Sequence, residues 1–196
     1  MKLETCDIIL WINEKNDPIS RLSRWAIGPY SHVAMYLEKF EGVPMVYESR
    51  GRGVTIASLL PQIGSLVAVM RPIFHLLPLK PPFSSPETFI PLKTRIIKTA
   101  LLLAADEKSF YDYSSIVHSV LPRIIAEKLP WLPLPVKYHR DIFFICSEAV
   151  AEVWWRNDME ILPRDVIPLP MDFALSPILR YVGTGKLMED IVPHDS

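Results

Sequence analysis

Three residue types in this sequence, a cysteine, a histidine and a glutamate, could together perform nucleophilic chemistry. Cys146 ends an apolar run, and after it Ala149, Val150, Val153 and Trp154 recur at three- and four-residue spacing. That spacing predicts a helix that begins near Cys146. The N–H groups of a first helical turn lie at the positive end of the helix dipole, which favours a thiolate and could hold a developing oxyanion. The alternative interpretation is a small buried cysteine that starts a core helix.

His32 and Glu48 are the candidate base and the carboxylate that orients it. The alternation in Ser31–Leu37 predicts a strand, and Val43–Ser49 returns as a second strand after a glycine-containing turn. With that turn centred on Phe40, residues pair when their numbers sum to 80, which places His32 opposite Glu48. Direct cross-strand neighbours have Cβ atoms roughly 5 Å apart. Glu48 could therefore orient the imidazole and fix its tautomer, as the third member of a nucleophile–base–orienter set does.

The other patterns supply the elements that position these groups. They predict a small antiparallel sheet with one capped helix in the first 71 residues, then helices and a last short strand. The expected elements are a strand at 7–12, a helix from Asp17-Pro18 to Gly28, strands at 54–57 and 66–70, a helix at 92–105, a helix bent at Pro122 and a strand at 178–182. We expect an α+β fold and one domain over residues 1–196, with a proline-rich connection at 72–91.

Composition excludes several classes of protein. The chain has 196 residues, is 49% hydrophobic and carries a formal net charge of −1, with no cluster of basic residues. We therefore expect no nucleic-acid partner. The two cysteines, Cys6 and Cys146, are too few for a disulfide framework and fit a reducing compartment. Without an apolar signal core or a membrane-spanning run, the expected location is the cytoplasm.

Three short blocks, taken in order, carry a resemblance to a known family. They resemble the circularly permuted papain-like enzymes of the YiiX/YebB type, which belong to the broad NlpC-type peptidase superfamily and are relatives of lecithin:retinol acyltransferase. The blocks are Asp7–Leu10, then Tyr30–Tyr36 with Val46–Glu48, then Phe144–Val150, and Tyr111-Asp112 and Asp172–Pro177 also look like that family.

The resemblance implies a permuted papain-like fold, in which a small antiparallel sheet carries the histidine and glutamate and packs against a helix with the cysteine at its N-terminus. By this resemblance Cys146 matches the nucleophile, His32 the base and Glu48 the polar partner. The sequence departs from the family where Cys6 replaces a glycine before the first aspartate, and at 107–110, where another glycine is missing. The stretch at about 114–140 looks like an insertion in which substrate choice would be made.

The leading hypothesis is a cysteine hydrolase that cleaves an amide or peptide bond through a thioacyl-enzyme intermediate. The N–H of Cys146 and a group near Trp11 are the candidate oxyanion donors. An acyltransferase or a thioesterase/lipase-type enzyme that uses the same thiol is the alternative, and the apolar segment 116–135 is its only support. We expect the proline-rich loop at 130–135 within it to be a hairpin packed over the core, and the other interpretation is a pocket wall or a membrane contact. A non-catalytic binding module is the third hypothesis.

No cofactor and no metal are expected. A zinc site built from His32, Glu48 and Cys146 has no support from a close-spaced pair of ligands. His139 lies seven residues before Cys146, about 23 Å away if that run is extended at roughly 3.3 Å per residue, and is a poor base. The expected partner is a peptide, amide or acyl substrate, and the sequence does not indicate an oligomeric state.

Overall fold

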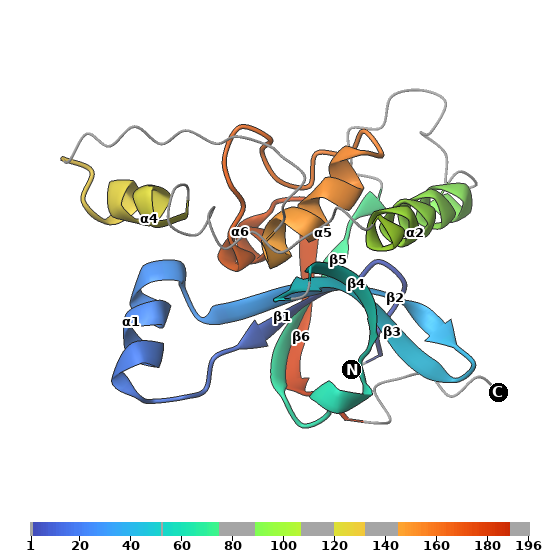
Figure 1. Ribbon diagram of the computed structural model, residues 1–196, viewed down its shortest axis with the longest axis horizontal. Coiled ribbons are helices and arrows are strands. Elements are labelled where there is room, and N and C mark those ends of the chain that lie inside the picture. The colour runs from blue at the N-terminus through green and yellow to red at the C-terminus, as the bar shows by residue number, and fades with distance from the viewer. Residues whose placement is uncertain (1, 52, 75–88, 107–119, 132–144, 189–196) are drawn as a thin grey trace.

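In the described part of the chain, the strands form one six-stranded antiparallel sheet, in the order β4-β3-β2-β1-β5-β6 (Figure 1). The computed structural model describes residues 2–51, 53–74, 89–106, 120–131 and 145–188. The strands are β1 (Ile8–Ile12), β2 (Tyr30–Phe40), β3 (Val43–Arg50), β4 (Gly53–Ser58), β5 (Leu66–Pro72) and β6 (Leu179–Lys186). The last strand of the chain thus joins the sheet built by the N-terminal part.

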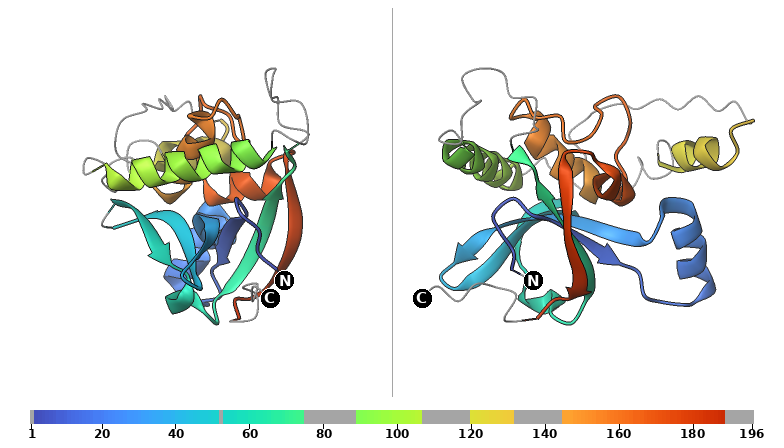
Figure 2. Two further views of the ribbon diagram at one scale, coloured as in Figure 1. Left: turned by 90° about the vertical axis from the view of Figure 1, so that its right-hand side faces the viewer. Right: turned by 180° about the vertical axis from the view of Figure 1, so that it is seen from behind.

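Helices cover one face of this sheet, while the sheet curls on its other side (Figures 1 and 2). The helices are α1 (Pro18–Ile27), α2 (Phe89–Ala105), α4 (Leu121–Lys128), α5 (Cys146–Trp155) and α6 (Pro170–Leu175), with a 3-10 turn η1 (Leu60–Gln62). The pictures place α2, α5 and α6 above the sheet, and α4 above α1 at one end of the molecule. This arrangement confirms the α+β class.

The alternation of side chains along the strands divides the apolar residues between two cores. On the face toward the helices, Met35 and Tyr47 pack with Val150 and Trp154 of α5, and all four are buried. On the curled face, Trp11 joins Ala34 and Tyr36 of β2 in a second cluster. Helix α5 is buried along its whole length, so its N-terminus has a fixed place against β2 and β3.

Helix α1 begins and ends where its capping residues predict. The Asp17 carboxylate accepts the Ser20 N–H at 2.9 Å, and Pro18 occupies the first turn. Gly28, at φ +84°, ends the helix and donates its N–H to the Arg24 carbonyl. The cap leads directly into β2 and the candidate histidine.

The predicted pairing of β2 with β3 was wrong by two residues. The observed pairs nearer the site are Met35 with Tyr47 and Tyr36 with Val46, whose numbers sum to 82. Next to the turn Phe40 pairs with Val43, a sum of 83, because the register shifts between Tyr36 and Lys39. The strands are joined by Glu41 and Gly42, which both have positive φ (50° and 79°), as a tight two-residue hairpin requires. A shift of two residues keeps every side chain on its face. Glu48 therefore stays on the same face as His32, but diagonally offset.

Three other predictions need correction or lie outside the described part of the chain. The proline-rich connection was predicted to reach residue 91, but α2 begins at Phe89; residues 75–88 lie outside the described ranges. The helix predicted to bend at Pro122 instead has that proline in its first turn, where its missing N–H costs nothing. Most of the expected insertion at 114–140 also lies outside the described residues.

Candidate active site

The structure brings His32 and Glu48 into direct contact. The Nε2 atom of His32 lies 2.8 Å from Oε2 of Glu48, and both side chains are largely buried, with 17% and 6% exposed. His32 pairs with Trp11 of β1 across the sheet, while Glu48 pairs with Thr55 of β4 on its outer side. The contact therefore spans the diagonal offset between β2 and β3, a distance that long side chains can reach.

Cys146 is the first residue of α5, as predicted, and is 8% exposed. The helix begins after Ile145, whose extended backbone and N–H form the cap with Glu148: the carboxylate Oε2 accepts the Ile145 N–H at 3.1 Å. Glu148 thus serves the helix terminus. The first N–H groups of α5 have no partner within the helix, and Cys146 belongs to this first turn.

The electrostatics of His32 link it to both neighbours. Burial by itself would lower the pKa of His32, but hydrogen bonds to Cys146 and Glu48 and the negative charges of both groups raise the pKa from 6.5 to about 9. Of the two ring nitrogens, Nε2 is the one that faces Glu48. The three residues that the sequence singled out therefore form one connected group.

Glu48 has a second partner, Arg50, that sequence reasoning missed. The Arg50 Nε donates to the same Oε2 of Glu48 at 2.9 Å. Burial would raise the pKa of Glu48, but the hydrogen bond and charge of His32, together with Arg50, hold it below its usual 4.5. The available signal was spacing, because residues two apart on a strand share a face.

Trp11 contacts the imidazole rather than the thiol. Its ring centroid lies 5.2 Å from that of His32, with the two planes inclined by 55°. The indole Nε1 is buried and has no hydrogen-bond partner among the described residues. Trp11 does not line the cavity beside Cys146. Its assignment as an oxyanion donor stays a prediction, and the observed contact positions the ring of His32.

A cavity of about 210 Å³ opens beside Cys146. Its wall includes Ile27 at the end of α1, Leu121 and Ile124 of α4, and Cys146 itself. No local sequence pattern indicates this cavity, because its walls come from segments more than 90 residues apart in the chain, from Ile27 to Leu121. The group at Cys146 can thus receive a substrate from this side.

The described residues contain no cluster of three or more His, Cys, Asp and Glu side chains that could hold a metal ion. The four other histidines, His75, His118, His139 and His194, lie outside the described ranges. None of the helices in these ranges is long and apolar enough to cross a bilayer.

Comparisons with known proteins relate the chain to others by fold. No family model matches the sequence, and no curated protein is significantly similar to it. Among solved structures, the chain is similar to the crystal structure of the metalloprotein YiiX from Escherichia coli O157:H7, with 18% sequence identity and a TM-score of 0.50. The match covers 95% of this chain and 99% of that chain. The chain therefore has an α+β fold related to that of YiiX.

Proposed function

We propose that the protein is a cysteine hydrolase of the permuted papain-like type, which cleaves an amide or peptide bond with Cys146, His32 and Glu48. One observation carries the proposal: His32 is held by Glu48 at 2.8 Å and interacts with Cys146, which starts a buried helix. This is the nucleophile–base–orienter arrangement that activates a thiol. The similarity to YiiX supports the fold in which the proposal is framed.

In the first half of the reaction, the Cys146 sulfur attacks the carbonyl carbon. The S–C bond forms, and first-turn N–H groups of α5 stabilise the tetrahedral oxyanion. The C–N bond then breaks as His32 gives its proton to the leaving amine. In the second half, His32 takes a proton from water, the hydroxide attacks the thioester, and the C–S bond breaks to release a carboxylic acid and the thiolate. Glu48 keeps the imidazole in place throughout.

YiiX is a metalloprotein. Histidine, cysteine and glutamate side chains can also hold a metal ion that assists hydrolysis, which is a different mechanism from attack by a cysteine thiolate. In this chain, Nε2 of His32 is already engaged by Glu48, whose Oε2 also accepts from Arg50. No suitable set of three ligands exists in the described ranges. The donors around Cys146 do not fit a metal centre, and the proposed steps use none.

The test is the rate of Cys146 alkylation by iodoacetamide between pH 5 and 10, in the wild type and in His32→Ala and Glu48→Ala. We expect alkylation at pH 7 to slow by at least about tenfold in His32→Ala, because the imidazolium that stabilises the thiolate is gone. Glu38→Ala, an exposed change on β2, is the matched control and should react like the wild type. An alkylation rate indifferent to His32 would make Cys146 a structural residue.

Amide cleavage needs its own measurement. We expect peptides from a defined mixed library to be cut by the wild type and left intact by Cys146→Ala, with products identified by mass spectrometry.

A second candidate, transfer or hydrolysis of a lipid acyl group, is favoured by the apolar side chains that line the cavity beside Cys146. Cleavage of acyl esters but no peptide, with activity that depends on detergent or vesicles, would select that candidate.

A further inference from the structure

The cavity beside Cys146 has a wall that is mainly apolar. The apolar side chains that line it are Ile27, Val120, Leu121, Ile124, Ile145 and Leu169. Its volume is about 210 Å³. An apolar cavity of about 150 Å³ is enough to bind benzene. A space of this size and lining therefore suits one aromatic ring or a short branched alkyl chain.

The hydroxyl groups in the wall are already used by the fold. The Ser147 Oγ donates to the carbonyl of Pro168 at 2.7 Å, and the Ser31 Oγ donates to the carbonyl of Trp11 at 3.4 Å. Among the residues that the structure describes, no charged side chain lines the cavity. A polar or charged group placed there would lose its hydration without gaining partners. Within this wall the thiol of Cys146 is the group left to react.

We propose that this cavity is the acyl subsite of the enzyme, which holds an apolar group attached to the carbonyl carbon that Cys146 attacks. The inference rests on the proposed function and adds the substrate class. The leaving amine becomes polar and protonated, so it belongs in solvent, whereas the acyl group stays bonded to sulfur and must lie beside Cys146. The substrate is thus an amide of an apolar acid, and Leu121 and Ile124 determine specificity.

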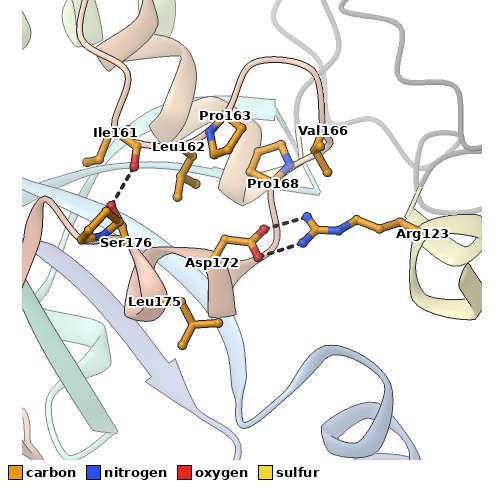
Figure 3. A pocket seen from close by; sticks show the side chains of 10 residues that line it. Arg123, Ile161, Leu162, Pro163, Val166, Pro168, Asp172, Leu175 and Ser176 are labelled. Atoms are coloured by element: carbon orange, nitrogen blue, oxygen red, sulfur yellow. Dashed lines mark hydrogen bonds and ion pairs between the residues drawn. The ribbon is translucent and has the colours of Figure 1, made fainter. Parts of the chain in front are cut away.

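The wall formed by α4 is fixed to the body of the protein by an arginine. Arg123 donates to both carboxylate oxygens of Asp172 on α6, at 2.7 and 2.8 Å (Figure 3). It also donates to the carbonyl of Ile167. Asp172 in turn accepts the N–H of Leu169, another residue of the cavity wall, at 2.7 Å. Arg123 is therefore a positioning residue, which keeps α4 over the cavity while neighbouring residues of α4 line it.

The experiment uses 4-nitrophenyl esters as acyl donors of known size. Cys146 forms an S–C bond to the acyl carbon, 4-nitrophenolate leaves, and water later hydrolyses the thioester to the free acid. We expect acylation by 4-nitrophenyl phenylacetate to exceed acylation by the acetate by about 10- to 100-fold, after correction for spontaneous hydrolysis. The charged glutarate ester should react more slowly than the valerate ester of similar length. Cys146→Ser supplies the background rate.

Two leucines at the two ends of α4 provide a matched pair of variants. Leu121 lines the cavity and is 49% exposed, whereas Leu129 follows the helix, is 37% exposed and does not line the cavity. Leu121→Gln should reduce the phenylacetate-to-acetate ratio by about tenfold, and Leu129→Gln should leave it unchanged. Ile124→Ala should shift the preference toward longer acyl chains, because it enlarges the space.

The outcomes separate the inference from the proposed function. Equal acylation rates across the ester series, together with His32-dependent alkylation by iodoacetamide, would overturn the acyl subsite and leave the hydrolase proposal standing. An alkylation rate that is the same in the wild type and in His32→Ala would overturn both the acyl subsite and the hydrolase proposal. A size preference that Leu121→Gln and Leu129→Gln reduce equally would also overturn the subsite, because the preference would then not arise from the cavity wall.

Discussion

One oxygen of Glu48 holds two cations at once: Oε2 lies 2.8 Å from Nε2 of His32 and 2.9 Å from Nε of Arg50. The carboxylate is buried, and a buried carboxylate needs such partners to stay ionised. The charge it keeps in turn favours the protonated imidazole beside Cys146. The protonation of the Cys146–His32 pair thus depends on Glu48, which itself forms or breaks no covalent bond in the proposed reaction.

Glu48→Gln should lower the pKa of His32 from its value of about 9, because the substitution removes the carboxylate charge while keeping a side chain of similar shape. The measurement is an NMR titration of the His32 ring signals. Glu38→Gln, on an exposed position of β2, should leave the titration unchanged. A His32 titration that does not move in Glu48→Gln would show that Glu48 does not set the charge of the ring.

The stability that His32 contributes should fall at alkaline pH. The folded-state pKa of about 9 lies above the 6.5 of an ordinary histidine, so the folded state binds the proton more tightly. This contribution is fully present below about pH 6.5 and is lost as the pH rises through about 9. The difference in unfolding free energy between the wild type and His32→Gln should therefore shrink by about 1–3 kcal/mol from pH 6 to pH 10. Urea titrations at both pH values would contradict this if the difference grew.

In the native protein, iodoacetamide should modify one cysteine and spare the other. Cys6 is completely buried, and burial is the main cause that raises the pKa of its thiol to about 12. Mass spectrometry should find one label on native protein, at Cys146, and two after denaturation. Cys146→Ser should acquire no label while folded. Labelling of Cys6 at a comparable rate in that variant would show that the N-terminal segment opens readily.

The sequence located the chemical groups of the site because local patterns specify them. The alternation in β2 and β3 fixed the faces of His32 and Glu48, and the apolar spacing after Cys146 fixed the start of α5. The pairing register was wrong because Glu41 adopts a positive φ, which is uncommon for glutamate and shortens the turn, so that Phe40 pairs with Val43. A register shift between Tyr36 and Lys39 then leaves the pairs beyond it two residues from the predicted register. An error of two residues keeps each side chain on its predicted face, so His32 and Glu48 still meet.

Two parts of the site that the sequence analysis did not predict, the cavity wall and the contact of Arg50, depend on tertiary structure. The cavity wall depends on where α4 lies, and that position is set by Arg123, which reaches Asp172, 49 residues further along the chain. Neither hydrophobic spacing nor capping signals encode such a contact. The role of Arg50 follows from a shared strand face, but its bond to Glu48 depends on how the side chains turn at the end of β3.

Removing the Arg123 contact should loosen the wall of the cavity. Asp172→Asn breaks a partly buried pair with two hydrogen bonds and should lower the unfolding free energy by about 1–3 kcal/mol. Glu127→Gln removes the other, half-exposed partner of Arg123 and should cost less than about 1 kcal/mol. Chemical denaturation measures both. Equal costs would show that the link between α4 and α6 does not depend on Asp172.

At Cys6 a glycine variant should be more stable than an alanine variant, which is the reverse of their usual order of stability in a helix. Cys6 has φ +76°, in the left-handed region that favours glycine, and its N–H donates to the Tyr36 carbonyl at 2.8 Å. Both Cys6→Gly and Cys6→Ala lose the buried sulfur, but only the alanine variant keeps the strained Cβ. Cys6→Gly should therefore be more stable than Cys6→Ala by about 1 kcal/mol. In helix α2, by contrast, Ala100→Gly should destabilise the protein by about 1 kcal/mol, because glycine is the poorer helix former. Thermal or urea unfolding of the three variants measures both differences, and a Cys6→Ala variant as stable as Cys6→Gly would mean that the backbone there relaxes without strain.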